Sequence, residues 1–424
     1  MAREIELNHI CKIEGHASLK LKIEKNVVKE CELETEEGAR FFEALVLGKN
    51  IKDIQEIVSR ICGICSCSHS VAAIYALENA LGIKASEKEK IVRDLLLIGE
   101  RIRSHATHLY FLALPDYLGL SALTMAKEQR GKVDDALKLI RFGNKIVETF
   151  GGREIHPFVG FNSNAKGSSE LKTGINEVKK VAEDTLKLFS SIKYPDLVRE
   201  TKYLSLHEDD EYAFSSGEIL SDNVEIKTRD YSKHLKENIK EYGTSKFVLF
   251  DNKSFVTGAL VRVNNNRDLL DKETKRLIKK YEIELPLENS FQNNVAQAIE
   301  IMFCIGLAER LIEKLGAGKY DCGEKEIRIK SGIGVAAVEA PRGTLFHEYK
   351  IDKDGKIEYC NIITPTAQNL NQMEIDIKNY VQELLKRDVD KEKIVMEIEK
   401  LIRAYDPCFS CSTHFLKVDW VEKF

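Results

Sequence analysis

The sequence predicts an α+β fold that is predominantly α, with a long-helix bundle core and small antiparallel β elements at the N-terminus and near the C-terminal half. Residues 1–38 alternate polar and apolar side chains with the period of β-strands. Residues 68–192 and 289–404 instead contain long runs with helical periodicity. Two alternating segments flank the turn residues Asp354 and Gly355, which predicts a β-hairpin.

Capping residues set the expected helix boundaries. The run SVAAIYALENAL should end at Gly82. Ser86, followed by Glu89, has the pattern of a capping box and should open a long helix that ends before Pro115, because proline cannot donate a backbone hydrogen bond. Later helices are expected over 132–150 and 169–191, from Asn289 or Ser290 to Gly316, and in two segments before the last cysteine pair.

The middle of the chain differs from both helical parts. Residues 198–262 are richer in Tyr, Val and Ser, and the segments KYLSLHE, NVEIKT and FVTGALVRV alternate, so we expect an inserted β-rich or irregular layer. Repeats and Pro/Gly/Ser linkers are absent from the sequence. Residues 1–414 are therefore expected to form a single domain, with 415–424 as a tail.

Composition excludes several classes of function. The formal net charge is only -4 and the charges are mixed along the chain, which argues against a nucleic-acid partner or an anionic membrane surface. No run approaches the length of about 18 apolar residues that a transmembrane helix needs. The first residues carry charges where a secretory signal is apolar, so we expect a cytoplasmic protein. Ten cysteines are too few for a disulfide scaffold and should be reduced.

Four cysteines fall in two C-x-x-C pairs, Cys62 with Cys65 and Cys408 with Cys411. Each such turn places two sulfurs a few ångströms apart, so the two turns together could form a four-thiolate cage. Soft thiolate ligands suit zinc, iron-sulfur clusters or nickel, and the spacing does not choose among them. A structural zinc site that pins the two ends of the fold therefore remains an alternative.

The residues around both pairs resemble the two signature motifs of nickel-iron hydrogenase large subunits. The first motif is Arg60-x-Cys-Gly-x-Cys-x-x-x-His69 and the second is Asp406-Pro-Cys-x-x-Cys-x-x-His414. The resemblance extends over the whole chain and is closest to cytoplasmic bidirectional or sulfhydrogenase-type subunits. It includes the segments Lys12–His16, Arg40–Glu43, Gly151–Pro157, Glu339–Gly343 and Thr364–Thr366. Lys12 replaces the usual arginine, and Phe41 replaces a common glycine.

This resemblance implies a binuclear centre. In it, Cys62 and Cys408 bind nickel terminally, whereas Cys65 and Cys411 bridge nickel to an iron that carries cyanide and carbon monoxide. Thiolates suit this task because they donate electron density and can bridge two metals. Cys67 lies inside the first motif but matches no ligand position.

The resemblance also implies the groups that act on the substrate. Heterolytic cleavage of dihydrogen releases a proton, which Cys408 would accept and Glu14 would relay outward. Arg342, whose backbone is stiffened by Pro341, would suspend a fixed positive charge over the metals. Thr366 would donate a hydrogen bond to a cyanide. His69 would hydrogen-bond a cysteine sulfur or a diatomic ligand, as outer partners of metal sites do. Taken alone, each has a plain structural interpretation as a loop, surface or packing residue.

A second metal is expected away from the thiolates. Glu43, the Ile362 carbonyl and His414 would hold a magnesium or iron ion, and a maturation protease would remove residues 415–424 after His414. Asp116 could belong to an acidic group above the centre, although a carboxylate at the end of a helix is the more ordinary interpretation.

The chain would need partners to pass electrons on. The resemblance implies an iron-sulfur small subunit and further subunits linked to a pyridine nucleotide, flavin or ferredoxin. Two alternatives to a hydrogenase are a hydrogen-sensing regulatory subunit and a four-cysteine zinc protein. Quinone-reductase-like relatives from respiratory complex I lack the four cysteines, so their presence argues against that class.

Overall fold

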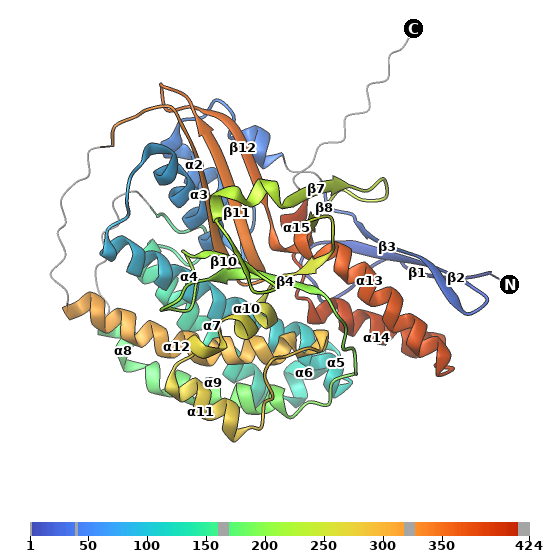
Figure 1. Ribbon diagram of the computed structural model, residues 1–424. Coiled ribbons are helices and arrows are strands. Elements are labelled where there is room, and N and C mark those ends of the chain that lie inside the picture. The colour runs from blue at the N-terminus through green and yellow to red at the C-terminus, as the bar shows by residue number, and fades with distance from the viewer. Residues whose placement is uncertain (1, 39–40, 160–168, 318–326, 414–424) are drawn as a thin grey trace, which may run out of the picture.

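The computed structural model describes residues 2–38, 41–159, 169–317 and 327–413 (Figure 1). The α-helices are α1 (Phe42–Leu45), α2 (Ile51–Ser59), α3 (Ser66–Leu81), α4 (Glu87–Thr107), α5 (Leu114–Leu118), α6 (Ala122–Glu128), α7 (Arg130–Gly151), α8 (Ser169–Thr173), α9 (Ile175–Ser190), α10 (Ala259–Asn265), α11 (Lys272–Lys280), α12 (Asn293–Ala317), α13 (Pro365–Lys386), α14 (Lys391–Ala404) and α15 (Phe409–Ser412). A π-helical segment, η1, covers His108–Ala113, and short 3-10 segments are η2 (Thr228–Lys233), η3 (Arg267–Leu269) and η4 (Ser290–Gln292).

The strands form four small sheets in the described residues. They are β1 (Ala2–Leu7), β2 (Ala17–Glu24), β3 (Val27–Thr35), β4 (Lys202–His207), β5 (Glu218–Ser221), β6 (Val224–Ile226), β7 (Leu235–Ile239), β8 (Lys246–Phe250), β9 (Phe255–Val256), β10 (Gly332–Ala340), β11 (Gly343–Ile351) and β12 (Ile357–Ile363). The sheet orders are β1-β2-β3, β10-β11-β12, β6-β5-β4-β9 and β7-β8, and only the β4 to β9 pairing is parallel. The predominantly helical α+β class is confirmed.

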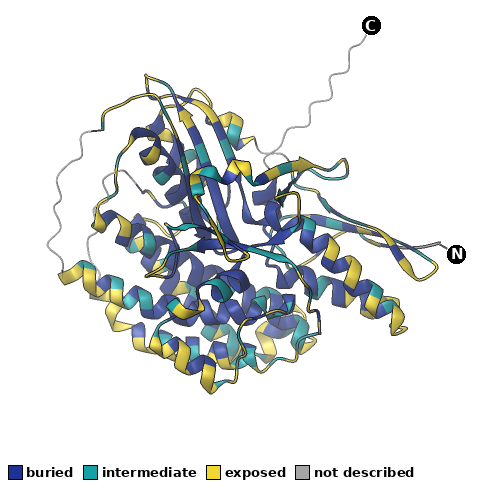
Figure 2. Cartoon of the chain, in the orientation of Figure 1, coloured by how far each residue is buried: buried dark blue, intermediate teal, exposed yellow. Residues whose placement is uncertain are grey.

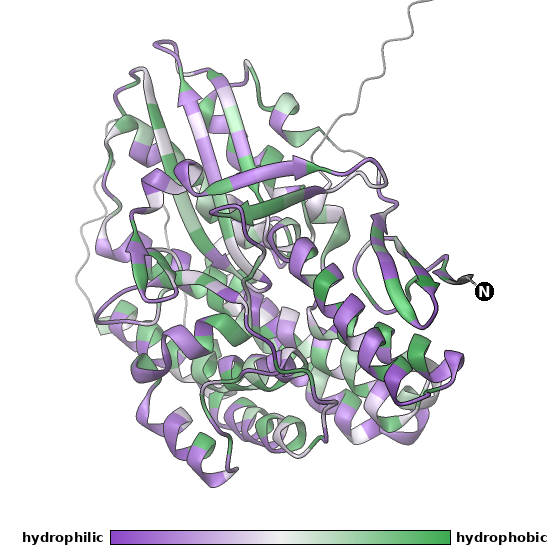
Figure 3. Cartoon of the chain, turned by 45° about the vertical axis from the view of Figure 1, so that its right-hand side comes forward, coloured by the Kyte–Doolittle hydropathy of each residue, from purple (hydrophilic) through white to green (hydrophobic). Residues whose placement is uncertain are grey.

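A bundle of long helices, α4, α7, α9 and α12, forms the base of the molecule (Figure 1). Gly99 and Gly143 let α4 and α7 approach closely, because a Cβ atom on Gly143 would collide with the Gly99 carbonyl. The outer helices carry both polar and apolar residues, as expected of helices that bury one face (Figure 3). Their inward faces are buried and the outermost residues are exposed (Figure 2).

The β10-β11-β12 sheet connects this bundle to the second half of the chain. Helix α3 packs against β10 and β11. A Cβ atom on Gly334 of β10 would collide with α3 at the Ala76 carbonyl, so this glycine allows the close contact. A second, smaller core includes Phe250, Phe255 and Phe346 and joins this sheet to the β4 sheet. Helix α3 and the β4 sheet thus both pack against the β10-β11-β12 sheet and hold it in position. Among the described helices, none has the length and apolar character needed to cross a bilayer.

Several predicted elements are confirmed. The three N-terminal strands form the expected antiparallel sheet, and both residues of the turn between β2 and β3, Lys25 and Asn26, are left-handed. Ser86 and Glu89 make the predicted capping box at the start of α4. The hairpin around Gly355 is formed by β11 and β12. The assignment of residues 198–262 to an inserted layer remains a prediction.

Two local predictions were wrong, and one strand was not predicted. Pro115 does not end the helical path, because the wider π-helical turn of η1 precedes it and Pro115 lies in the first turn of α5, where a backbone donor is not needed. The alternating run FVTGALVRV is a strand only at Phe255–Val256, since Gly258 has a φ of 134° and α10 follows it. Strand β10 was not predicted because its glycines and alanines lack strand propensity.

A buried ion cluster lies where α4, α10, α12 and β10 meet. Its members are Arg101, His105, Arg262, Glu300 and Glu339, and their side chains have no exposed surface. Glu300 binds both His105 and Arg262 at 2.7 Å. The two guanidinium groups balance the two carboxylates, which limits the large cost of burying charge. Burial lowers the pKa of His105 from 6.5 to about 4, so His105 is neutral at neutral pH.

We expect His105 to make the protein acid-sensitive. Between pH 6.5 and about pH 4, His105 is protonated in the unfolded chain but stays neutral in the folded protein. The free energy of unfolding therefore falls as the pH falls through this window. His105→Gln keeps a donor toward Glu300 but cannot titrate. Wild type should lose up to about 3 kcal/mol more than the variant across the window, measured by urea unfolding. Parallel pH profiles of the two proteins would contradict this role.

Candidate metal centre

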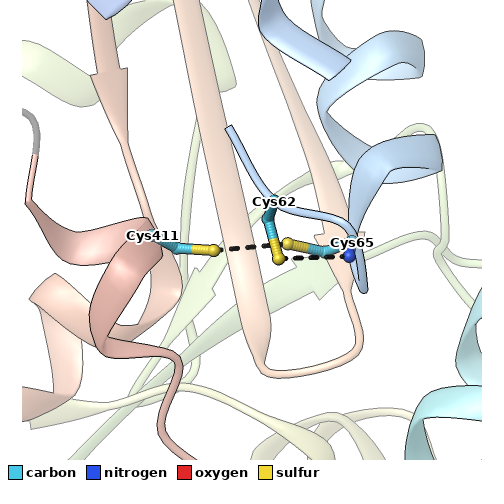
Figure 4. A group of neighbouring side chains, drawn as sticks. All are labelled: Cys62, Cys65 and Cys411. Carbon is cyan, nitrogen blue, oxygen red and sulfur yellow. Dashed lines mark hydrogen bonds between the residues drawn. The ribbon is translucent and has the colours of Figure 1, made fainter. Parts of the chain in front are cut away.

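The two C-x-x-C turns meet in the interior of the protein. Cys62 lies in the turn between α2 and α3, Cys65 precedes α3 directly, and Cys408 and Cys411 belong to the short segment around α15. Sγ of Cys62 lies 3.7 Å from Sγ of Cys408, and Sγ of Cys65 lies 3.5 Å from that of Cys411. Figure 4 shows the sulfurs of Cys62, Cys65 and Cys411 directed toward one another from opposite sides.

The four thiols are almost completely shielded from solvent. Their exposed fractions are 3% for Cys62, 7% for Cys65, 1% for Cys408 and 2% for Cys411. Burial raises the pKa of Cys408 and Cys411, whereas the hydrogen bond with Cys408 lowers the pKa of Cys62. Several thiolates cannot coexist in so small a buried volume without positive charge. The donor set therefore fits soft metal ions that replace the thiol protons.

The loop that carries Glu14 is joined to the last cysteine pair. The Glu14 carbonyl accepts from the Phe409 backbone N–H at 3.0 Å. Its carboxylate accepts from Sγ of Cys408 at 2.9 Å and from both the backbone and the hydroxyl of Ser410. Gly15 must be glycine, because its φ is 82° and a Cβ atom would lie 2.8 Å from the Ser410 nitrogen. Glu14 is half-buried, so its carboxylate lies between the buried Cys408 thiol and the surface of the protein.

Arg342 lies in the turn between β10 and β11, directly after Pro341. Its Nε donates to the Asp406 carbonyl at 2.7 Å, and its Nη2 donates to the Asp406 carboxylate at 3.0 Å. Its buried Nη1 has no hydrogen-bond partner within the part of the chain that the structure describes. A small pocket borders this group and is lined by Cys65, His69, Ala340, Arg342, Leu345, Pro365, Thr366, Cys408 and Cys411. A guanidinium N–H is therefore available beside the thiols.

Two other predicted residues lie on the same pocket. Thr366 is in the first turn of α13, and its hydroxyl oxygen accepts from the Cys408 backbone N–H at 2.9 Å, which leaves its own proton to donate. His69, on α3, has Nδ1 3.1 Å from Nε2 of His347, whose other ring nitrogen lies 2.8 Å from the Tyr349 hydroxyl. His347 was not predicted, because nothing in the sequence pattern pairs it with His69.

The residues expected at a second metal site are only partly described. Oε1 of Glu43 accepts from the Ile362 backbone N–H and from Lys246, both at 2.8 Å, and burial raises the pKa of Glu43. Lys246 also lies 2.8 Å from Glu237. His414 and the tail at 415–424 lie outside the described residues. Lys246 and Glu237 come from β8 and β7, far from Glu43 in sequence, and were not predicted.

Asp116 does not line the pocket. It pairs with Arg403 at 2.6 Å and with Lys12, two residues before Glu14. Arg403 also donates to the Cys11 carbonyl at 2.9 Å. Asp116 thus anchors the Glu14 loop, so the ordinary interpretation as a carboxylate at a helix end is the better one.

The sequence matches the family described as Nickel-dependent hydrogenase over residues 40–150 and 158–414. It is 35% identical to the Sulfhydrogenase 1 subunit alpha of Pyrococcus furiosus, with 98% of each chain covered. It is 34% identical to the Sulfhydrogenase 2 subunit alpha of the same organism, covering 98% of this chain and 100% of that one. The resemblance to sulfhydrogenase-type subunits is confirmed.

Solved structures share the fold. An NAD+-reducing [NiFe]-hydrogenase superposes with a TM-score of 0.86 at 24% identity, covering 97% of this chain and 99% of that one. The Ni-Fe-Se hydrogenase from D. vulgaris Hildenborough gives 0.80 at 23% identity, covering 98% and 100%. The family match and the two Pyrococcus furiosus relatives support a hydrogenase large subunit over the zinc-protein and hydrogen-sensor alternatives. The chain belongs to the nickel-dependent hydrogenase family, as the large, catalytic subunit that holds a nickel-iron centre.

Proposed function

We propose that this chain reversibly cleaves dihydrogen into protons and electrons at a nickel-iron centre held by Cys62, Cys65, Cys408 and Cys411. One observation carries the proposal: four buried thiols converge beside a carboxylate that contacts one of the sulfurs and a guanidinium N–H that has no partner among the described residues. When bound, the metals would supply the polarisation that splits dihydrogen heterolytically. The protein residues would fix the metals, orient small ligands and remove the proton.

The small pocket beside the thiols borders Cys65, Cys408 and Cys411. Cyanide and carbon monoxide on the iron would occupy such a pocket. The resemblance to the family, rather than the pocket lining, implies that Cys65 and Cys411 would bridge to that iron and that Cys62 and Cys408 would be terminal on nickel. Arg342 and Thr366 would donate hydrogen bonds toward the cyanides. Pro341 would shape the turn that carries Arg342, and His69 would line the pocket that holds these ligands.

The proton would leave through Glu14. Cys408 is the thiol in contact with this carboxylate, at 2.9 Å, so a proton on its sulfur can pass to Glu14 without rearrangement. The Ser410 hydroxyl donates to the other carboxylate oxygen and would hold it in place. Because Glu14 is half-buried, its carboxyl group lies between the buried thiols and the protein surface, and a proton on it could pass on toward solvent.

A second cation, magnesium or iron, would bind Glu43, the Ile362 carbonyl and His414. Both hydrogen bonds of Glu43 fall on Oε1, which leaves Oε2 as the oxygen that could face an ion. Oxygen and imidazole ligands suit such a cation. A maturation protease would cut after His414, and the mature protein would then lack residues 415–424.

Electrons would pass to an iron-sulfur small subunit. One of the solved structures that share the fold is named as an NAD+-reducing hydrogenase. Further subunits linked to a pyridine nucleotide, flavin or ferredoxin would therefore complete the assembly. A cytoplasmic location would keep the thiols reduced.

Cys65→Ser should abolish assembly of the centre. A serine oxygen is a hard, poor bridging ligand, so nickel per chain should fall by at least about 10-fold, and the infrared bands of cyanide and carbon monoxide should disappear. Cys67→Ser is the matched control, because Cys67 is equally buried on α3 but stands outside the thiol cluster. Normal metal content and bands in Cys65→Ser would contradict the ligand assignment.

Glu14→Gln should separate proton transfer from metal binding. The amide keeps a similar shape but cannot carry a proton, so turnover should fall about 100-fold while nickel content and infrared bands stay unchanged. Glu37→Gln is a suitable control, since Glu37 bonds His16 in the same loop but does not contact a thiol. Full turnover in Glu14→Gln, measured as exchange between dihydrogen and solvent protons, would exclude this exit.

A further inference from the structure

The turn that carries Arg342 is held in place by hydrogen bonds from two buried arginines. Strand β10 ends at Ala340 and β11 begins at Gly343, so Pro341 and Arg342 form the whole loop. The three carbonyls before Arg342 each accept a hydrogen bond from an arginine. Glu339 O accepts from Arg101, and Ala340 O and Pro341 O both accept from Arg262 at 2.9 Å.

Every donor of the Arg262 guanidinium is used. Besides the two carbonyls, Arg262 donates to the Glu339 carboxylate at 3.1 Å and twice to Glu300 at 2.7 Å, which makes five hydrogen bonds in all. Its exposed fraction is 0%. Only a planar guanidinium can meet these acceptors together, because a lysine ammonium has fewer donors and no fixed plane.

The opposite side of the turn is fixed by the segment that opens α10. The Thr344 backbone N–H donates to the Thr257 hydroxyl at 2.9 Å. Gly343 has a φ of 136°, and a Cβ atom there would collide with Thr257. Arg262 lies in α10 and Thr257 lies two residues before this helix, so α10 and the residues that lead into it both contact the turn. The Arg342 backbone is therefore tied to α10, while its head is tied to Asp406.

We propose that Arg262 is a positioning residue that sets where the Arg342 guanidinium lies beside the four thiols that would hold the metals. This inference rests on the proposed function. It assigns to the buried ion cluster a task beyond stability: Glu300 orients Arg262, and Arg262 holds the two carbonyls that precede Arg342. A displaced turn would carry the unpartnered Nη1 of Arg342 away from the pocket, and electrostatic stabilisation of this kind depends steeply on position.

The test compares Arg262→Lys with Arg93→Lys in the matured holoenzyme. Arg93 is the matched control because it too is fully buried and forms a two-bond pair with a glutamate, Glu78, but it does not contact the turn. The measurements are nickel per chain, the positions of the cyanide and carbon monoxide infrared bands, and the rate of dihydrogen exchange per nickel.

In Arg262→Lys we expect shifted cyanide bands and an exchange rate per nickel reduced about 10-fold or more, at near-normal nickel content. Arg93→Lys should keep wild-type bands and rate per nickel, even if it is less stable. A purely structural role for Arg262 would lower the amount of loaded protein but leave the bands in place, and that result would overturn the proposal.

A second variant covers the case in which Arg262→Lys does not fold. Glu300→Gln leaves the contacts of Arg262 with the turn but removes the carboxylate that orients it, so a smaller band shift is expected. Wild-type bands and rate in Glu300→Gln would then count against the proposal. Absence of the diatomic bands from wild-type enzyme would instead refute the proposed function, so the two failures are distinguishable.

Discussion

The site depends on one constraint: sulfur atoms separated by 346 residues must meet in a dry interior. Two contacts satisfy it. The Glu14 loop pairs with Phe409 through the backbone, and α3 sets Cys65 at its N-terminal end against the β10-β11-β12 sheet. The four sulfurs are thus brought together by the backbone pairing and the helix packing around them. Metal ligands held on rigid elements can be placed more accurately than ligands on free loops.

The ion cluster beneath the site is an unusual way to support a loop. Buried ion pairs add little net stability, because desolvation offsets most of the Coulomb attraction. Here, however, the guanidinium of Arg262 reaches backbone carbonyls that no apolar side chain could hold. The same geometry makes removal of one partner costly, since an unpaired charge would be left with no exposed surface.

Sequence patterns predicted the helical class, the N-terminal sheet and the hairpin at Gly355 because these depend on periodicity and local capping. They predicted the four cysteines and Arg342 through motifs that stand intact in the chain. They could not predict partners supplied by distant elements. Lys246 meets Glu43, His347 meets His69, and Asp116 pairs with Lys12 only through tertiary packing. Strand β10 was also not predicted, because its glycines have low strand propensity and are explained only by the close contact with α3.

The pairing of Glu14 with Phe409 has a consequence for how the protein is made. A ribosome must synthesise 409 residues before Phe409 can reach the N-terminal loop, so the four-thiol site cannot form before that point. Only two of the four thiols exist during most of that time. A chain that lacks the segment around residue 409 would therefore be unable to hold metals that need all four thiols.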